Sequence, residues 1–417
     1  MMQDRLGRRT LLGGALAAAP LAAAPLVAAP LAPGRAQGTA GAAKPGPVRI
    51  GVLTDASGPY SDSGGPGSAT AARMAASDFG GTVLGQDIEV LLGDTQNKPD
   101  VAGALARKWY DAEGVDAIID LPVTPIALAV QQAAKEKLRT VIITAAAISE
   151  FTSKLCSPVS THWADDTHAM TTGTAKQVVA NGGKTWFFIT VDFSFGKLLQ
   201  EAATGVITAN GGKVIGTATF PIGNTDFSSQ LVQAQSSGAQ VIGLAAVGND
   251  QVNAIKQASE FGLTKGGKQT MAGFLVYTTD IHALGLAATQ GFVLSSSFYW
   301  DQNDQARTFA HRFHAERKAM PTRNQACDYA ATLHFLKAMA QAGTRDPIAV
   351  NKAMRAMPAA YFGHQASIRA DGRVLYDVTL YRVKTQAESK EDWDFYAPIA
   401  TLSAAEAFLP MTPSCGT

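Results

Sequence analysis

The stretch from residue 49 to residue 79, RIGVLTDASGPYSDSGGPGSATAARMAASDF, decides the fold class. It begins with the apolar run Arg49-Ile50-Gly51-Val52-Leu53, which is typical of a buried parallel strand. A turn rich in glycine and hydroxyl side chains follows, and from residue 67 to residue 79 apolar residues recur at helical spacing. The stretch therefore predicts a strand, a loop and a helix, which is the repeating unit of an α/β sheet.

The same unit recurs along the chain. Apolar runs at 117–119, 140–143 and 186–189 predict further buried strands. The motif Asn-Gly-Gly-Lys occurs at 181–184 and again at 210–213, each time where a helix should end and a strand begin. Gly and Asn accept the left-handed conformation of a helix C-terminus, so successive βα units of a parallel, doubly wound sheet are expected. Near the C-terminus, Asp371-Gly372 between extended segments predicts a hairpin.

Length, charge and motif content limit the classes of function. A chain of 417 residues is longer than one hydrophobic core usually serves, so two domains are expected. The net charge of +1 argues against a nucleic-acid partner. CxxC, HExxH, GxxxxGKS/T, GxSxG and a strand-linked GxGxxG are all missing from the sequence. These observations favour a binding protein that uses no cofactor over an enzyme.

The first 36 residues indicate export. Arg8 and Arg9 precede a stretch of Ala, Leu and Pro, as in a twin-arginine signal peptide. The prolines argue against the alternative, a membrane helix. Cleavage is expected after Ala36, and the small residues at 40–42 offer a second position. Residues 37–47 predict a flexible leader, and the mature protein is expected in the periplasm.

The cysteines fit an oxidising compartment. Three of them, Cys156, Cys327 and Cys415, predict one disulfide and one free thiol. We favour a disulfide between Cys156 and Cys415. The alternative is that all three thiols are unpaired.

The candidate binding site lies in the loops that follow the strands, because doubly wound sheets bind their ligands at the carboxyl ends of the strands. In the first half, hydroxyl side chains and small residues leave backbone amides accessible to a carboxylate. In the second half, the corresponding loops carry aromatic rings, which supply contact area. The residues that we expect around the ligand are Ser57, Tyr60, Thr124, Ala146, Ala147, Trp163, Phe193, Phe195 and Tyr277.

One group of side chains resembles a metal site. His162, Asp165, Asp166 and His168 offer nitrogen and oxygen ligands within a short segment. Polar loop residues that flank Trp163 explain the same pattern, so no metal is expected. An exported metal-dependent enzyme remains the less favoured alternative.

Several motifs together resemble the branched-chain amino acid binding protein family, the type I periplasmic solute-binding proteins of ABC transporters. The resemblance covers about residues 47 to 400 and is carried, in order, by RIGVLT with SGPY at 49–60, GVDAII at 114–119, DFSFG at 192–196 and GNTDFS at 223–228.

This resemblance implies two doubly wound lobes that are joined by a hinge of three crossovers and close on a ligand. Lobe I would comprise residues 48–166 and 295–360, and lobe II residues 167–294 and 361–417. The protein would act as a monomer and deliver a small molecule to the membrane permease of an ABC importer. A sensor that presents the ligand-bound shape to a signalling receptor is the alternative.

The resemblance also implies a ligand class. Backbone and hydroxyl groups at positions matching 122–124 and 145–147 would hold a carboxylate, and Phe195 matches a family tyrosine. The acidic residue that pairs a ligand amine would fall near Leu275, where there is none, although Asp280 is close in sequence. The segments HWADDT at 162–167 and FYWD at 298–301 resemble a branch associated with aromatic acids. A small carboxylate, with an aromatic acid first, is therefore expected; a branched-chain or other amino acid is the alternative.

Overall fold

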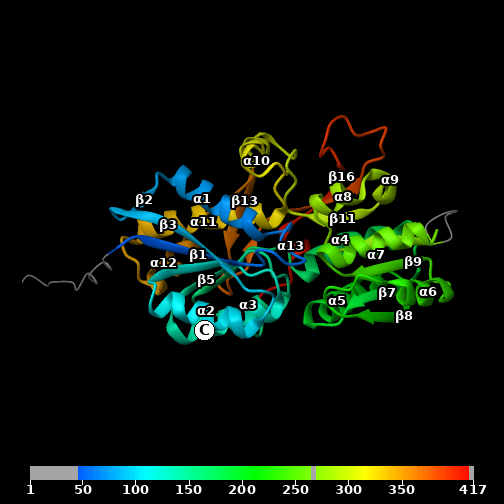
Figure 1. Cartoon of the computed structure of the whole chain (residues 1–417), viewed down its shortest axis with the longest axis horizontal. Coiled ribbons are helices and arrows are strands. Elements are labelled where there is room, and N and C mark those ends of the chain that lie inside the picture. The colour runs from blue at the N-terminus through cyan, green and yellow to red at the C-terminus, as the bar shows by residue number, and fades with distance from the viewer. Residues whose placement is uncertain (1–45, 264–268, 413–417) are drawn as a thin grey trace, which may run out of the picture. The chain divides into compact units, whose positions relative to one another are not determined.

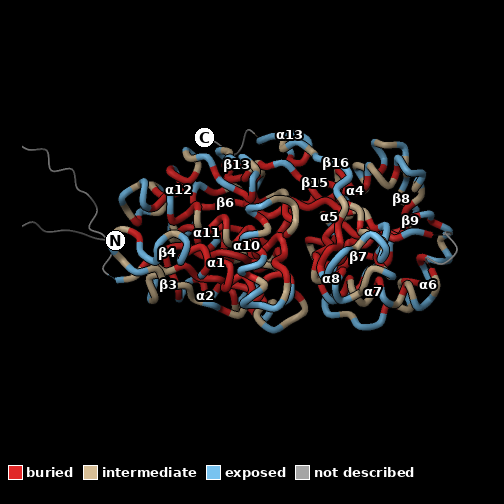
Figure 2. Tube along the Cα trace, turned by 90° about the horizontal axis from the view of Figure 1, so that it is seen from above, coloured by how far each residue is buried: buried red, intermediate tan, exposed pale blue. Residues whose placement is uncertain are grey.

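The computed structural model describes residues 46–263 and 269–412 (Figure 1). The predicted signal peptide, residues 1–36, and residues 37–45 of the predicted leader lie outside these ranges and stay predictions. Buried apolar side chains form one continuous core. Figure 2 shows the buried residues in red inside both sheet regions and exposed residues on the outer loops. None of the described helices is long and apolar enough to cross a membrane.

Six strands form the first sheet, in the order β2-β3-β1-β4-β5-β6. Every neighbouring pair is parallel except β2 with β3. Strands β4 and β5 are buried along their whole length, as their continuous apolar runs predict. The bounds are β1 (Val48–Thr54), β2 (Thr82–Val83), β3 (Gln86–Asp94), β4 (Val115–Asp120), β5 (Thr140–Ile143) and β6 (Ser160–His162).

Helices cover the first sheet on both of its faces (Figure 1). A Cβ atom at Gly51 of β1 would come within 2.4 Å of the Trp109 ring, so glycine lets α2 pack directly on this strand. Helix α1 packs against α11, which comes from much later in the chain. The helices of this region are α1 (Gly65–Phe79), α2 (Pro99–Asp111), α3 (Thr124–Lys137), a 3-10 turn (Ser149–Thr152), α10 (Asp304–Arg317), α11 (Arg323–Ala342) and α12 (Pro347–Ala356).

Four parallel strands form the second sheet, in the order β10-β9-β7-β8. The strands are β7 (Thr185–Val191), β8 (Lys213–Phe220), β9 (Val241–Ala245) and β10 (Thr270–Gly273). The helices are α4 (Thr167–Ala180), α5 (Ser194–Ala209), α6 (Ser228–Ser236), α7 (Gly248–Glu260), α8 (Thr278–Leu284) and α9 (Leu286–Thr289).

The two Asn-Gly-Gly-Lys motifs end helices α4 and α5 and precede strands β7 and β8, as predicted. The glycines carry the left-handed conformation, with φ of 100° at Gly182 and 80° at Gly211. Asn181 and Asn210 keep negative φ, so only the glycines are required by the backbone at these positions.

Antiparallel strands complete the fold. β11 (Val293–Ser296), β15 (Val378–Val383) and β16 (Tyr396–Leu402) form one sheet, followed by α13 (Ala404–Ala407). β12 (Ala359–Tyr361), β13 (His364–Ile368) and β14 (Val374–Leu375) form another. The predicted hairpin is confirmed, because β13 and β14 pair across the turn that contains Gly372, with φ of 90°.

The chain passes between the two α/β regions three times, between β6 and α4, between β11 and α10, and between β14 and β15. The α/β fold with parallel sheets joined in this way confirms the predicted fold class. The exact division into lobes stays a prediction. In the structure, β13 contacts α12 and Arg373 bridges to His162 of β6, so the segment from residue 361 to residue 375 lies beside the first sheet.

Of the three cysteines, Cys327 is buried and free. Cys415 lies outside the described residues, so its predicted disulfide with Cys156 stays a prediction.

Candidate functional site

A cavity lies where the carboxyl ends of strands from both parallel sheets meet, and the space not occupied by atoms there, including its opening to solvent, is about 370 Å³. Loops after β1, β4 and β5 form one wall, and loops after β7, β9 and β10 form the opposite wall. This is the position at which doubly wound sheets bind ligands. The lining residues are Tyr60, Ser63, Pro122, Val123, Thr124, Ala145, Ala147, Phe193, Phe195, Val247, Leu275, Tyr277 and Asn324.

The loop after β1 is shaped by the carboxylate of Asp55. It accepts hydrogen bonds from the backbone amides of Gly58, at 2.7 Å, and Tyr60, at 2.9 Å. Tyr60 is thereby held in the cavity wall, and its hydroxyl is buried without a partner among the described residues. Burial, followed by the carboxylates of Asp250 and Asp55, raises the pKa of Tyr60. The hydroxyl therefore stays protonated and available as a donor to a ligand.

Backbone amides supply further donors. Thr124 begins α3, so its amide lies at the positive end of the helix dipole. Neither this amide nor that of Ala147 has an acceptor among the described residues. Asp120 and Leu121, just before the helix, have φ of 81° and 68°, which is a strained conformation for residues with a Cβ. This backbone path brings the helix start and the loop after β5 to the same cavity, where the amides can bind an anionic oxygen.

The second wall is apolar and aromatic. Phe193 and Phe195 place their ring centroids 5.9 Å apart, and Val247 and Leu275 add aliphatic surface. Tyr277 precedes α8, and its hydroxyl accepts a hydrogen bond of 2.9 Å from Asn324. Such a wall suits a flat or apolar ligand body.

No residue that lines the cavity carries a charged side chain. Asp280, which sequence reasoning left open as an amine partner, is buried outside the lining and accepts the backbone amide of Tyr277 at 3.0 Å. Burial raises the pKa of Asp280 to about 7. Asp250, which interacts electrostatically with Tyr60, is also outside the lining and accepts the amide of Gly223 at 3.1 Å.

Six of the nine predicted residues line this cavity, namely Tyr60, Thr124, Ala147, Phe193, Phe195 and Tyr277. Their contact with a ligand stays a prediction. Sequence reasoning did not single out Ser63, Val247, Leu275 or Asn324 as ligand contacts. Asn324 lies two residues after Thr322, in the first turn of α11. The Thr-x-x-Gln capping box at Thr322 is the sequence signal that could have indicated this helix start.

Three predicted residues are not among those that line this cavity, and their contact with a ligand also stays a prediction. Ser57 is exposed to solvent, and its hydroxyl donates to Asp94 at 3.3 Å. The Ala146 carbonyl faces His162 instead, at 2.8 Å from its Nε2. Trp163 is fully buried, and its indole donates to Thr161 at 3.2 Å, so the ring belongs to the core.

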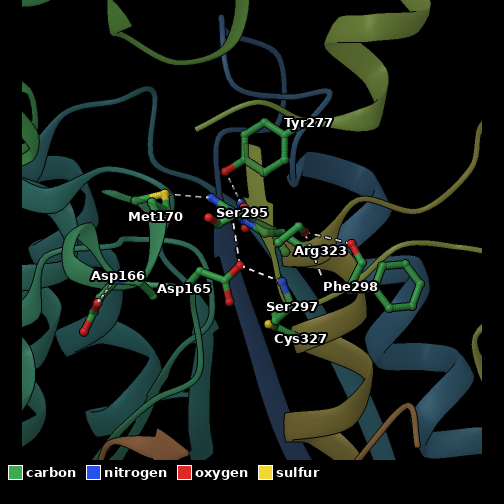
Figure 3. A network of polar contacts seen from close by, with 12 residues as sticks. Asp165, Asp166, Met170, Tyr277, Ser295, Ser297, Phe298, Arg323 and Cys327 are labelled. Carbon is green, nitrogen blue, oxygen red and sulfur yellow. Dashed lines mark hydrogen bonds and ion pairs between the residues drawn. The ribbon is translucent and has the colours of Figure 1, made fainter. Parts of the chain in front are cut away.

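A buried polar network lies behind the Tyr277 wall (Figure 3). Asp165, in the first crossover, accepts hydrogen bonds from Arg323 at 3.2 Å and from the Ser297 amide of the second crossover at 2.9 Å. Tyr376, in the third crossover, donates to the same carboxylate at 3.0 Å. The Arg323 guanidinium also lies 5.3 Å from the centre of the Tyr277 ring. One carboxylate thus joins the three crossovers next to the cavity.

The surroundings of His162 argue against the alternative of a metal site. Nε2 of this side chain is bonded to the Ala146 carbonyl, and Nδ1 lies 3.0 Å from the Arg373 guanidinium. Burial, followed by the Arg373 charge, lowers the pKa of His162 well below its ordinary value. Because Asp165 is occupied by Arg323, these side chains form a structural network.

Two α/β sheets whose strand ends share one uncharged cavity define a two-lobed ligand-binding protein. The family model described as periplasmic binding protein matches residues 47–390, and the chain belongs to this family. The predicted recognition and the type I fold are thereby confirmed, and the family is one of binding proteins and not of enzymes.

Solved structures and curated relatives agree with this assignment. A periplasmic binding protein from Burkholderia mallei is 44% identical, with a TM-score of 0.85 over 89% of this chain and 98% of that chain. A branched chain amino acid ABC transporter periplasmic ligand-binding protein from Burkholderia xenovorans LB400 is 38% identical, with a TM-score of 0.76 over 87% and 97%. The Leu/Ile/Val-binding protein homolog 6 of Brucella melitensis is 28% identical over 59% of this chain, and the match spans 63% of that relative's length.

Proposed function

We propose that the chain is the periplasmic solute-binding component of an ABC importer and that its cavity closes on a small carboxylate, with an aromatic acid as the first candidate. The observation that carries this proposal is the composition of the cavity wall. It offers the unpartnered Tyr60 hydroxyl and two unpartnered backbone amides, at Thr124 and Ala147, but no charged side chain.

These donors suit a carboxylate. Hydrogen bonds to a charged acceptor contribute about 1.5–3 kcal/mol each, and a helix start adds a favourable field. The opposite wall, with Phe193, Phe195 and Tyr277, would hold the body of the acid by its area.

An α-amino acid is the second candidate, because the Burkholderia xenovorans relative is described as a branched chain amino acid transporter component. Its ammonium group would be buried against Leu275 and Val247, and burying an unpaired charge costs several kcal/mol. Asp250 and Asp280 both lie outside the lining of the cavity, and each already accepts a backbone hydrogen bond. This arrangement favours an acid without an amine.

A thermal-shift screen tests the proposal. Benzoate, 3-phenylpropanoate, hexanoate and 4-methylpentanoate would be compared with leucine, valine and phenylalanine. A ligand at 100 times its dissociation constant adds about 2.7 kcal/mol to stability, so a binding acid should raise the melting temperature clearly. Phe193→Ala should reduce this shift, whereas Ile348→Ala, exposed on α12, should keep it. A shift produced by the amino acids alone would refute the proposal.

The proposed cellular setting rests on the sequence and the family. The twin-arginine segment would bring the protein to the periplasm, where it would deliver its ligand as a monomer to a membrane permease. Sensing by a signalling receptor is the alternative use of the same binding event. Loss of uptake of the bound acid on deletion of the gene would support transport, and unchanged uptake would support sensing.

A further inference from the structure

Two fully buried carboxyl groups, those of Asp120 and Asp328, interact behind the cavity wall that the loops after β1, β4 and β5 form. Asp120 is the last residue of β4 and lies two positions before Pro122 of the cavity lining. Asp328 lies on α11, one turn after Asn324, which also lines the cavity. The pair is therefore close to the backbone amides that would bind the ligand carboxylate.

Hydroxyl groups surround this pair. The Thr144 hydroxyl donates to Oδ1 of Asp328, and the residue after Thr144 lines the cavity. Ser68, on α1, interacts with both carboxyl groups. A Cβ atom built at Gly64 would come within 3.1 Å of Oδ2 of Asp120 and within 3.2 Å of the Ser68 hydroxyl oxygen. The two carboxyl groups therefore share one part of the core, packed between β4, α1 and α11.

No positive charge balances the pair. The only other charge that acts on either carboxyl group, among the described residues, is the carboxylate of Asp55. Both oxygens of Asp120 and Oδ2 of Asp328 are buried without a hydrogen-bond partner in the same part of the chain. In contrast, the buried carboxylate of Asp116 is paired with Arg345. Two neighbouring buried carboxylates without a cation cannot both be ionised, so the pair must hold a proton.

The pKa values agree with a protonated pair. Burial raises the pKa of Asp120 to about 7. Burial, followed by the charge of Asp120, raises the pKa of Asp328 well above its ordinary value. The described residues contain no group of three or more Asp, Glu, His or Cys side chains that could hold a metal ion, so a proton is the simplest neutralising charge.

We propose that Asp120 and Asp328 form a proton site behind the carboxylate-binding wall, and that the protein takes up a proton at this site when it binds an acid. This inference rests on the proposed function, because the ligand carboxylate would lie beside the amides of Thr124 and Ala147. A negative charge on the buried pair would repel the ligand carboxylate with little screening by water, whereas a protonated pair would not. Acid binding and protonation of the pair therefore favour each other.

The sign of the pH dependence follows from this coupling. At low pH the pair is already protonated in the free protein, and the affinity for the acid should be highest there. As the pH rises through about 7, each binding event must also capture a proton, so the affinity should fall. The ligand itself does not change its charge over this range, because a carboxylic acid in water titrates near about pH 4.

Calorimetry on the mature protein measures the coupling, with benzoate, 3-phenylpropanoate, hexanoate and 4-methylpentanoate as the probes. The binding enthalpy is compared near about pH 7 in phosphate and in Tris, two buffers with different ionisation enthalpies, and the difference gives the number of protons taken up. The wild-type protein should take up a fraction of a proton. Its affinity should fall about tenfold between about pH 6 and about pH 9.

Substitutions assign the proton to the pair. The double variant, Asp120→Asn with Asp328→Asn, has no carboxyl group at this place, so its proton uptake should disappear and its affinity should vary little with pH. Asparagine tolerates the left-handed φ of 81° at position 120, which preserves the backbone. In Asp328→Asn alone, the remaining carboxyl group has lost its like-charged neighbour, so the fall in affinity should move to lower pH.

The control is Asp280→Asn. Burial also raises the pKa of Asp280 to about 7, but this carboxyl group is outside the cavity lining and lies on the opposite wall, after β10. Its substitution should leave the proton uptake and the pH dependence of binding as in the wild type. The control therefore separates the pair from buried carboxyl groups in general.

Binding of acids without proton uptake by the wild type would overturn this inference and leave the proposed function intact. Uptake that persists in the double variant, or that disappears in Asp280→Asn, would place the proton elsewhere and also overturn it. If the double variant does not fold, a wild-type pH profile in Asp328→Asn has the same meaning. If no acid binds, the proposed function itself fails and the proton coupling fails with it.

Discussion

The backbone amide of Asn249 donates to the carbonyl oxygen of Pro59 across 3.4 Å. Asn249 lies in the first turn of α7 after β9, and Pro59 lies in the loop after β1, so this contact joins the two cavity walls. The neighbouring Gly248 has φ of 60°, and a Cβ atom built there would come within 2.7 Å of the same Pro59 oxygen. Close approach of the two walls therefore depends on a glycine at position 248.

Gly248→Ala should weaken ligand binding, because the added methyl group meets Pro59 in the closed arrangement and the left-handed backbone costs about 1–2 kcal/mol for a residue with a Cβ. Calorimetry with the tightest acid of the thermal-shift screen would measure the loss. Gly205→Ala is the matched control, since nothing lies within 4 Å of its Cβ position in α5. Equal affinities for the Gly248→Ala protein and the wild type would refute the closure argument.

Tyr60→Phe should reduce the affinity for the acid about tenfold to hundredfold, the effect of one hydrogen bond to a charged group. The melting temperature of the ligand-free protein should not fall, because this hydroxyl has no partner among the described residues. The control, Tyr110→Phe, should lower stability and leave the affinity unchanged, since its hydroxyl is bonded to Thr140. Unchanged binding by Tyr60→Phe would exclude the hydroxyl as a ligand donor.

Asp280 should make stability fall with rising pH. Burial raises the pKa of this carboxyl to about 7, whereas an aspartate in the unfolded chain titrates near about 3.9. The folded chain holds the proton more tightly, so this contribution to stability is complete below about pH 4 and is lost as the pH rises through about 7. The melting temperature of Asp280→Asn, relative to the wild type, should therefore increase between about pH 4 and pH 7.

Asp100→Asn serves as the control for this pH series, because Asp100 is exposed in the first turn of α2. Its melting temperature relative to the wild type should vary little with pH over the same range. A flat difference for Asp280→Asn as well would mean that the carboxyl is ionised in the folded protein.

Asp165→Asn should destabilise the fold by about 3–5 kcal/mol in urea unfolding, because it leaves the buried Arg323 guanidinium without a charged partner. The control is Glu388→Gln, at an exposed pair with Arg382, where little change is expected. An equal, small effect of both substitutions would show that the crossover network is not held by its ion pair.

The sheets could be predicted from the sequence because buried parallel strands have continuous apolar runs, as at 140–143, and because the Asn-Gly-Gly-Lys motifs end helices. The position of the cavity followed from the carboxyl ends of those strands. The predictions therefore succeeded where a local pattern determines the backbone.

Which side chain of a loop faces the cavity could not be predicted in the same way. Ala145 and Ala147 line the cavity, whereas Ala146 between them does not. All three are alanines, so the residue type could not distinguish them. Trp163 was expected near the ligand as part of the segment at 162–167, but its ring is fully buried, and Asp165 of the same segment belongs to a buried network. Arg323 and Tyr396 each have a buried polar atom, Nε and Oη, without a hydrogen-bond partner among the described residues. The two residues line the same small cavity because segments distant in the sequence pack together there.

The most direct test of the central claim compares leucine with 4-methylpentanoate by calorimetry, because the two differ only in the α-amino group. Phenylalanine and 3-phenylpropanoate form the second pair. The cavity offers donors for the carboxylate and no charged partner for an amine, so at least one acid should bind tighter than its amino acid by about tenfold or more. Tighter binding of the amino acid in both pairs, or no binding of either acid, would contradict the account.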